Sequence, residues 1–291
     1  MGGRAVPLFA EVRGIARRRS MALTTLRGGG RAWDDLIVSS ISPETGSVAT
    51  EAEPFSADGG PIGVLVLHGF TGSPQTVRGW AEHLAGGGLT VRAPLLTGHG
   101  GSWQQLARTG WTDWYSSAET AFADLRQRCE KVFVTGISMG GCLAFRLAET
   151  QGPAVSGLVV VNPSLAGDNP FIPFTPVLKH VIKVIPSIGG DIKKEGVQEN
   201  AVRRTPVASV ATLPEMWRTT AAELASVTQP LIVYRSTEDH VVGPKSMKVL
   251  MTALPGAEVR PLANSYHVAT LDNDAPEIFD GTLAFIREHS E

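Results

Sequence analysis

Short apolar runs alternate with longer amphipathic stretches along the chain from residue 62 to the C-terminus. Continuous apolar runs of this length predict strands that are buried on both faces of a sheet. They lie at 62–67, 89–93, 131–136, 155–161, 231–235 and 257–262. Helical spacing marks the stretches 73–88, 111–128, 139–149, 244–254 and 275–288. This alternation predicts an α/β fold with a mostly parallel sheet and helices on both of its faces.

Two of the predicted helices carry further detail at their starts. Ser73 precedes Pro74, and we expect the serine side chain to cap the helix while the proline occupies its first turn. Trp111, Trp114 and Tyr115 open the helix at 111–128. Their spacing predicts a face packed into the core, and a stacking platform for a ligand is the alternative.

The stretch from about 163 to 205 breaks this rhythm. It contains several prolines, the apolar segment Pro-Phe-Ile-Pro-Phe at 170–174, and a short amphipathic piece at 177–185. Ligands of open α/β sheets bind beyond the carboxyl ends of the strands, and we expect this insertion to lie there as a cap. The predicted organisation is therefore one domain over residues 41–291 with a cap insertion at about 163–205.

Residues 1–40 lie outside this pattern, and we expect them to form a disordered extension. The run 14–20 is basic, but no apolar run of signal-peptide length follows it, and the segment 21–26 is too short to span a membrane. Met21 is a candidate for the natural start because no core-like patterning precedes it. We expect a cytoplasmic protein without stable membrane insertion.

Composition narrows the classes of function. The formal net charge of −2 argues against a nucleic-acid-binding protein, which usually carries a marked basic excess. The two cysteines, Cys129 and Cys142, are too few for a disulfide framework, and we interpret both as structural thiols. Neither a phosphate-binding glycine motif nor a His-Glu-x-x-His zinc motif occurs, so we expect no metal and no organic cofactor.

The pentapeptide Gly-Ile-Ser-Met-Gly at 136–140 carries the strongest chemical signal. It follows a predicted strand and opens a predicted helix, where a serine on a tight turn needs small residues two positions before and after it. The free N–H groups of the helix start then face the site where an oxyanion would form. Ser138 is therefore the candidate nucleophile, and an ordinary strand-to-helix loop is the alternative.

A serine hydroxyl needs a base to take its proton, and the chain has seven histidines. His267 follows the last predicted strand and precedes the last helix, at the same sheet edge as Ser138, so it is the candidate base. We expect His83 and His289 to pack or to be solvated, His180 to lie on the cap surface, and His68 to shape its glycine turn.

The base needs an acid partner that holds one tautomer of its ring. Asp239 follows the predicted strand 231–235. It stands between serine and histidine in chain order, which is the order Ser, Asp, His found where the nucleophile sits on a strand-to-helix turn of this kind. Glu238 and Asp272 are its rivals. The alternation of side chains beyond the strand does not decide between Glu238 and Asp239, and a carboxylate that caps a turn is the alternative role for either.

Four motifs read HGFTGSP at 68–74, GISMGG at 136–141, EDHVV at 238–242 and NSYHVATLD at 264–272, and the cap contains IPSIGGDIKK at 185–194. Together these sequences resemble the bacterial carboxylesterase and monoacylglycerol lipase group of the α/β-hydrolase fold. The resemblance runs from about residue 60 to the C-terminus. It implies that Asp239 is the acid, that the backbone N–H groups of Phe70 and Met139 form the oxyanion hole, and that His99 shapes a loop.

The resemblance also implies a serine hydrolase that cleaves carboxylic esters, with monoacylglycerols or similar medium- and long-chain acyl esters as substrates. We expect Phe171, Ile172 and Phe174 of the cap to contact the acyl chain, with packing of the cap as the alternative. Glu195 and Glu199 are candidates for contact with the alcohol, with solvated charges as the alternative. A thioesterase or amidase would use the same triad, and a non-catalytic receptor of this fold is a further alternative.

Overall fold

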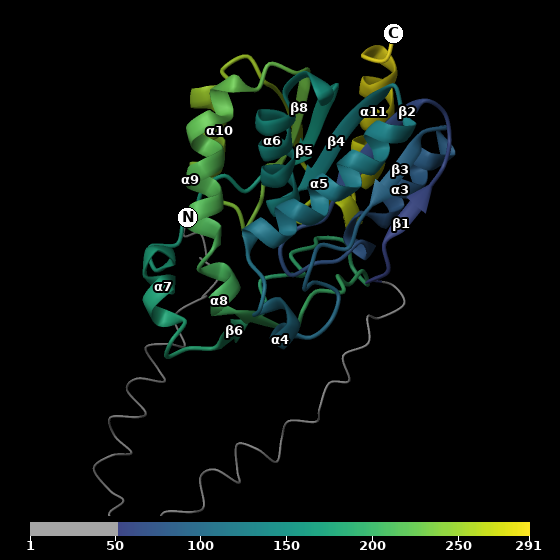
Figure 1. Cartoon of the computed structure of the whole chain (residues 1–291). Coiled ribbons are helices and arrows are strands. Elements are labelled where there is room, and N and C mark those ends of the chain that lie inside the picture. The colour runs from purple at the N-terminus through teal and green to yellow at the C-terminus, as the bar shows by residue number, and fades with distance from the viewer. Residues whose placement is uncertain (1–51) are drawn as a thin grey trace, which may run out of the picture. The chain divides into compact units, whose positions relative to one another are not determined.

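The computed structural model describes residues 52–291. Within them seven strands form one sheet in the order β1-β3-β2-β4-β5-β8-β9, shown in Figure 1. Only β1 is antiparallel to its neighbour, and the other six strands run parallel. Their bounds are β1 Phe55–Ala57, β2 Ile62–Leu67, β3 Thr90–Ala93, β4 Lys131–Ile137, β5 Gly157–Val161, β8 Leu231–Ser236 and β9 Glu258–Leu262. The prediction of a mostly parallel α/β sheet is confirmed.

Alternate residues of the central strands β2, β4, β5 and β8 enter two separate apolar cores. In β2, Leu65 and Leu67 face the first core, which also takes up side chains of the helices α5, α6, α9 and α10. Val64 and Val66 face the second core, built with α3 and α11. The helices flanking the sheet are α3 Gln75–Gly86, α5 Trp111–Arg128, α6 Met139–Gln151, α9 Leu213–Glu223, α10 Pro244–Ala253 and α11 Ala275–Glu288. Burial on both faces explains why the strands read as unbroken apolar runs.

The two largest fully buried side chains, Trp114 and Trp80, belong to these helices. Trp114 of α5 is fully buried, which confirms its predicted place in the core, and Trp111 and Tyr115 pack against the same cluster while partly exposed. On the other face the Trp80 indole N–H donates to the Thr282 hydroxyl at 3.1 Å, so its one polar group is satisfied. Burial of each such side chain contributes roughly 1.5–3 kcal/mol to folding.

The prediction that Ser73 caps α3 is wrong. The helix begins at Gln75 with Pro74 in the N-cap position, and no side chain caps it. The Ser73 hydroxyl is buried and makes no hydrogen bond with any residue in the range 52–291. The serine lies one position too early, because Pro74 itself takes the half-helical position that the prediction gave to Ser73.

The cap segment, residues 163–205, contains only short elements between β5 and the helix α8. It begins with η3 (Ile172–Phe174) and α7 (Thr175–Leu178), and an antiparallel pair follows, β6 (Val184–Pro186) with β7 (Arg204–Pro206). The predicted amphipathic piece at 177–185 is thus a helical turn followed by a strand. In Figure 1 α7, β6 and α8 lie together beyond one end of the sheet. The remaining elements are α4 Trp103–Leu106, α8 Val207–Val210, η2 Gly152–Ala154, η4 Leu224–Ser226 and η5 Ala269–Leu271.

Hydrogen bonds join the cap segment to two loops that follow strands. The Val202 N–H donates to the Thr71 carbonyl beyond β2 at 2.9 Å, and the Val268 N–H beyond β9 donates to the Asp191 carbonyl at 3.0 Å. These contacts lie at the carboxyl ends of the parallel strands. The exact bounds of the insertion stay a prediction, and the predictions for residues 1–40 and for Met21 lie outside the described residues.

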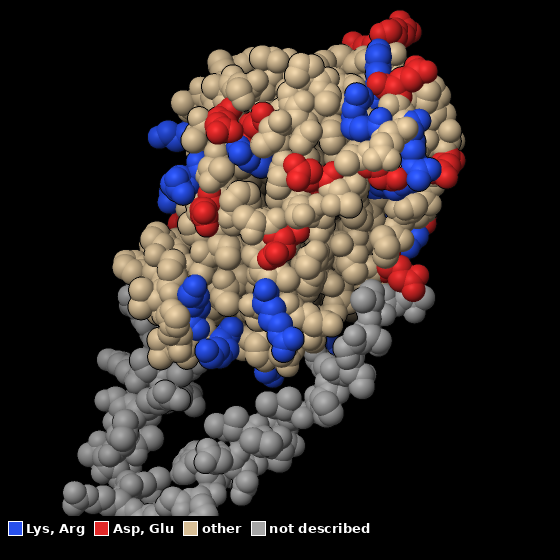
Figure 2. All heavy atoms as spheres, viewed as in Figure 1, with Lys and Arg blue, Asp and Glu red and all other residues tan. Residues whose placement is uncertain are grey.

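Cys129 and Cys142 are both free and buried, which confirms their interpretation as structural thiols. Figure 2 shows an even mixture of acidic and basic side chains over the helical layer and mostly Lys and Arg near α7 and α8. In the part of the chain that the structure describes, no helix is both long enough and apolar enough to span a bilayer. The predicted cytoplasmic location stays a prediction.

Candidate active site

Ser138 occupies the turn between β4 and α6, and its backbone adopts φ 55° and ψ −119°. A positive φ is uncommon for a residue with a Cβ and stores local strain. A Cβ atom at Gly136 would overlap the Gly140 backbone, and one at Gly140 would overlap the carbonyl of Leu67. The turn therefore tolerates only glycine at both positions, and this explains the two glycines of the pentapeptide at 136–140.

His267 and Asp239 form a hydrogen-bonded pair at the same edge of the sheet. The His267 Nδ1 atom lies 3.0 Å from Asp239 Oδ2. The Asp239 side chain is fully buried, and its Oδ1 atom accepts the N–H groups of Val241 at 2.9 Å and Val242 at 2.8 Å. Its Oδ2 atom also accepts the guanidinium of Arg235 at 2.6 Å. The carboxylate is held on every side, and it fixes the orientation of the imidazole.

The surroundings of Asp239 favour its charged form. Burial by itself raises the pKa of the Asp239 carboxyl, but the charge and hydrogen bond of His267, the charge of Arg235 and the Val242 N–H together bring this pKa below its ordinary value. An ionised aspartate beside Nδ1 keeps the proton of a neutral imidazole on that nitrogen. The Nε2 atom is then free to accept a proton.

The rival carboxylates have other partners. The Glu238 side chain is about half exposed and lies 3.7 Å from the Lys193 ammonium and 3.8 Å from His240 Nε2. Asp272 is buried and accepts the backbone N–H groups of Lys193 at 2.7 Å and Tyr266 at 2.9 Å, both at Oδ2. The geometry thus pairs His267 with Asp239 and gives Asp272 a role in joining the cap segment to the loop of His267.

The loop after β2 (residues 68–74), which we name the oxyanion loop for its predicted role, runs directly beside Ser138. A Cβ atom at Gly69 would lie 3.4 Å from the Ser138 Cβ, in ordinary van der Waals contact. Within residues 52–291 neither the Phe70 N–H nor the Met139 N–H takes part in a hydrogen bond. Two unused N–H groups next to a strained serine are what an oxyanion hole requires.

His68 holds this loop in place. Its ring is fully buried, and burial lowers its pKa to about 4, so the imidazole is neutral at physiological pH. The His68 Nε2 atom accepts the Leu96 N–H at 3.2 Å, which leaves the ring proton on Nδ1 to be donated to the Gly69 carbonyl at 2.9 Å. His68 therefore ties the loop after β2 to the loop after β3, as its predicted loop-shaping role requires.

An aromatic cluster lies behind this loop. The His99 ring makes edge contacts with His68 at 5.1 Å and with Trp114 at 5.4 Å, and the Phe70 ring lies 5.3 Å from Trp114. Burial also lowers the pKa of His99 well below its ordinary value. His99 thus packs as a neutral ring against the oxyanion loop, as the predicted loop-shaping role implies.

A family model of serine aminopeptidases of group S33 matches residues 62–274. The match runs from the first residue of β2 to the residue before α11 and includes all the motifs described above. This chain belongs to that family.

Relatives of this chain include lipolytic enzymes. The chain is 40% identical to a thermostable monoacylglycerol lipase of Bacillus sp. (strain H-257) over 84% of its own length and 97% of that protein. It is 23% identical to a carboxylesterase of Bacillus subtilis (strain 168), over 81% of this chain and 96% of that protein. A solved structure from work on the metagenome-derived lipolytic enzymes LipS and LipT superposes with a TM-score of 0.80 at 39% identity, covering 84% of this chain and all of that one. The predicted carboxylesterase and monoacylglycerol lipase group of α/β-hydrolases is confirmed.

Asn162 is a residue of the candidate site that the sequence analysis did not single out. It is fully buried, has a φ of 45° and directly follows β5. Its Nδ2 donates to the His267 carbonyl at 2.8 Å, and its Oδ1 accepts the Ser236 N–H at 2.8 Å. The preceding Val161 carbonyl accepts the Ser138 N–H at 2.9 Å. Asn162 thereby links the chain segments of all three triad candidates, and a lone polar residue at the end of an apolar strand is the signal that could have revealed it.

The cap segment contributes a half-buried carboxylate, Glu199. Its Oε2 atom accepts the Gly190 N–H at 2.6 Å, and its Oε1 atom accepts the Thr76 hydroxyl at 3.4 Å. Burial raises the pKa of the Glu199 carboxyl, and the nearby His267 opposes this rise. A Cβ at Gly72 would lie 3.1 Å from Glu199 Oε1, so the carboxylate reaches the far end of the oxyanion loop. Of the two predicted alcohol contacts, Glu199 lies at the site, whereas Glu195 is exposed.

The three predicted acyl contacts differ in their surroundings. Ile172 is partly buried and packs against the first apolar core, to which Phe70 and Met139 also belong. Phe171 is 39% exposed and Phe174 60% exposed on the cap segment.

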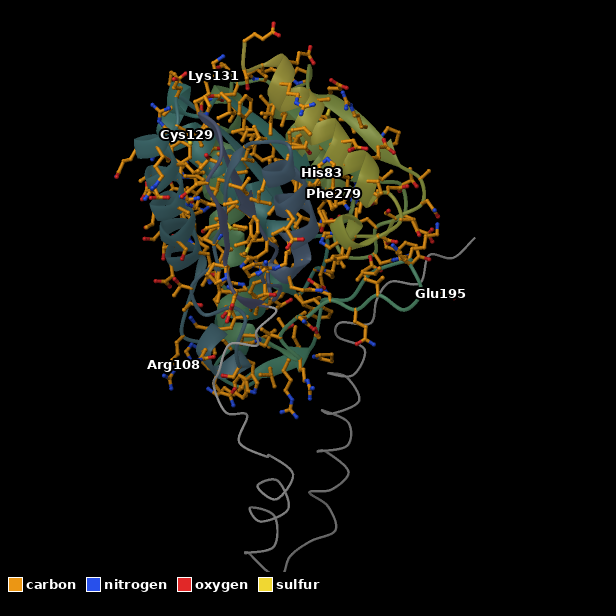
Figure 3. All side chains as sticks on the ribbon, turned by 90° about the vertical axis from the view of Figure 1, so that its right-hand side faces the viewer. His83, Arg108, Cys129, Lys131, Glu195 and Phe279 are labelled. Carbon is orange, nitrogen blue, oxygen red and sulfur yellow. The ribbon has the colours of Figure 1, made fainter. Side chains whose placement is uncertain are left out.

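His83, which we expected to pack or to be solvated, lies away from these contacts in α3. It packs beside Phe279 of α11, with ring centroids 5.9 Å apart, as the labelled side chains of Figure 3 show.

Proposed function

We propose that this chain hydrolyses carboxylic esters through a triad of Ser138, His267 and Asp239, and that monoacylglycerols are its substrates. One observation carries the proposal. A buried, fully hydrogen-bonded aspartate orients His267 at the sheet edge where the strained Ser138 opens α6. Membership of the carboxylesterase and monoacylglycerol lipase group supports the same chemistry.

Acylation begins when Ser138 Oγ attacks the ester carbonyl. His267 Nε2 takes the hydroxyl proton during the attack, and the Asp239 carboxylate stabilises the resulting imidazolium through Nδ1. The negative charge that develops on the carbonyl oxygen is stabilised by the N–H groups of Phe70 and Met139. Loss of one such donor typically lowers the rate by about two to three orders of magnitude.

The acyl-enzyme then forms and breaks down by the same groups. The protonated His267 gives its proton to the leaving alcohol, which departs as the acyl-Ser138 ester is completed. A water molecule attacks this ester while His267 takes a proton from it, and collapse of the second tetrahedral intermediate returns the proton to Ser138 and releases the acid. The residues that carry these steps need no metal ion.

The two sides of the site differ in polarity, which supports a long acyl chain on a small polar alcohol. Phe70, Met139 and Ile172 border one continuous apolar cluster on the acyl side, and we retain Ile172 as an acyl contact. On the other side the Glu199 carboxylate offers acceptors to hydroxyl groups. The relative from Bacillus sp. (strain H-257) is a monoacylglycerol lipase at 40% identity. The contacts predicted for Phe171 and Phe174 stay predictions.

A substrate panel tests this proposal. The purified chain should hydrolyse a monoacylglycerol much faster than the emulsified triacylglycerol of the same acid, and the Ser138→Ala variant should be inactive with native thermal stability. A small-molecule thioester of the same acid, run in parallel, separates an esterase from a thioesterase. Equal rates on triacylglycerol would contradict the substrate, and a fully active Ser138→Ala would contradict the triad.

A further inference from the structure

Asp191 of the cap segment touches both loops that carry the histidine and the aspartate of the proposed triad. Its Oδ2 atom accepts the backbone N–H of His267 at 3.1 Å and the backbone N–H of His240 at 3.2 Å. Its Oδ1 atom lies 2.8 Å from His240 Nδ1, and its side chain is only 17% exposed. One carboxylate from outside the sheet thus joins the loop of the base to the loop of the acid.

The peptide groups of His267 are held from two directions. The N–H is bound by Asp191 of the cap segment, and the carbonyl is bound by Asn162 of the sheet at 2.8 Å. With both groups fixed, the Cα–Cβ direction of His267 is set before its ring meets Asp239. A shift of about 1 Å in a reacting group costs up to about a hundredfold in rate. These two hydrogen bonds, which clamp the His267 backbone, therefore affect the reaction rate.

The clamp belongs to a reciprocal connection between cap and body. Asp191 accepts N–H groups of the body, while Asp272 of the body accepts the Lys193 N–H at 2.7 Å and the Lys194 N–H at 2.9 Å. The Asp191 carbonyl also accepts the Val268 N–H at 3.0 Å. Of these cap-segment residues, Asp191 is the one that contacts His267, the proposed base.

We propose that Asp191 is a positioning residue that couples the seating of the cap segment to the orientation of His267. The inference rests on the proposed triad, and it gives a residue of the cap segment a part in aligning the base of that triad. When the segment around residues 189–194 is seated, the His267 N–H is bound and the imidazole is aligned. When that segment moves away, the base loses one of the two bonds that fix its backbone.

The test measures the reactivity of Ser138 in the folded protein. It uses small reagents that do not depend on the cap segment for binding. The full-length chain is treated with a small fluorophosphonate, whose capture by Ser138 needs an aligned base but little binding energy, and kcat/KM is measured on nitrophenyl butyrate. Asp191→Ala should lower both rates together by about tenfold or more, because the base loses alignment. Asp191→Asn should restore most of this loss, since the amide oxygen can still accept both N–H groups and its NH₂ can donate to the other tautomer of His240.

Glu195→Ala is the matched control. Glu195 is an exposed carboxylate of the same segment, and Figure 3 shows it at the outer edge of the molecule. This variant should keep the wild-type rates. Equal losses in Glu195→Ala and Asp191→Ala, or wild-type phosphonylation in a folded Asp191→Ala, would overturn the proposal.

Two further results keep the test decisive. If Asp191→Ala does not fold, Asp191→Glu retains the charge but moves the carboxylate by one methylene group, and a wild-type rate in that variant would refute the positioning role. If the wild-type protein itself resists the fluorophosphonate, the triad fails rather than the role of Asp191. The two failures are therefore distinguishable.

Discussion

The backbone of Ser138 depends on two neighbours that have no side chain. The chain turns so tightly that a Cβ at Gly136 would meet the Gly140 backbone, and a Cβ at Gly140 would meet the carbonyl oxygens of Leu67 and His68. Leu67 and His68 lead directly into the oxyanion loop. The proposed nucleophile and the N–H groups proposed to stabilise the oxyanion are therefore held in register by one close backbone contact.

Replacing Gly140 by alanine tests this contact. The added methyl group has to displace the backbone of Leu67 and His68, which moves Phe70 away from the reacting carbonyl. We expect Gly140→Ala to lower kcat on nitrophenyl butyrate by about a hundredfold or more, the usual effect of losing an oxyanion donor. Gly256→Ala is the control, because no atom lies within 4 Å of the Cβ added there. A Gly140→Ala variant with wild-type kcat would show that the contact is dispensable.

Some of these residues were predictable from the sequence, and others were not. Ser138 and His267 could be proposed for the site because each follows a recognisable strand. Glu238 and Asp239 are adjacent after β8, and local alternation did not separate them. The hydrogen bonds from Val241 and Val242 to Asp239 set the course of that loop, and no periodic pattern encodes them.

For helices and strands, the length of each element decided whether its period could be recognised in the sequence. The long strands and helices were predicted to within one or two residues, whereas β1, β6 and β7 have only three residues each, too few for any period to show. Helix α9 is different. Leu213, Met216, Trp217 and Thr220 recur at helical spacing and are buried, so the signal was present and was overlooked behind the irregular cap segment.

The packing of α9 on α6 contains a titratable contact. Arg146 of α6 lies 2.8 Å from Glu149 of the same helix and 2.5 Å from Glu223 of α9. The Glu149 side chain has no exposed surface, whereas that of Glu223 is 56% exposed. Burial raises the pKa of Glu149 to about 7, against the opposing effect of Arg146.

This pKa makes stability depend on pH in a defined direction. A carboxyl whose pKa is raised by folding stabilises the protein below its unfolded pKa of about 4.3, and this contribution is lost as the pH rises through about 7. Glu149→Gln keeps a neutral side chain at every pH. We expect its melting temperature, relative to wild type, to increase between about pH 5 and about pH 8. Glu223→Gln removes the other partner of Arg146 but leaves the Glu149 carboxyl, whose pKa the Glu223 charge raises only as the smallest of the influences on it. Its difference from wild type should therefore change less with pH than that of Glu149→Gln, and equal trends in both variants would contradict the assignment to Glu149.

At the scale of the whole molecule, the cap segment connects loops that lie far apart along the chain. It binds the loop after β2 through Val202 and Thr71, and the loop after β9 through Asp191 and His267. Proline content and the break in rhythm were enough to predict a cap. Its contacts could not be predicted, because they join residues with no common local pattern and depend on the completed sheet.

Glu199 shows what this arrangement implies for the substrate. The cap segment brings its carboxylate to the oxyanion loop near Gly72 and within electrostatic range of His267, on the side where the proposed alcohol leaves. Glu199→Gln keeps the shape of the side chain but replaces one acceptor oxygen by a donor. A hydrogen bond to a charged group contributes about 1.5–3 kcal/mol, so loss of one contact with a glycerol hydroxyl should raise KM for a monoacylglycerol by about tenfold or more.

The comparison of two esters with the same acyl chain separates this effect from general damage. A nitrophenyl ester offers no hydroxyl groups to Glu199, and its kcat/KM should be unchanged in Glu199→Gln, whereas the monoacylglycerol is affected. Glu195→Gln, at the exposed carboxylate nearby, should change neither substrate. A parallel loss on both esters would mean that Glu199 supports the loop rather than the alcohol, and the polar half of the site would then have to be supplied by another part of the cap segment.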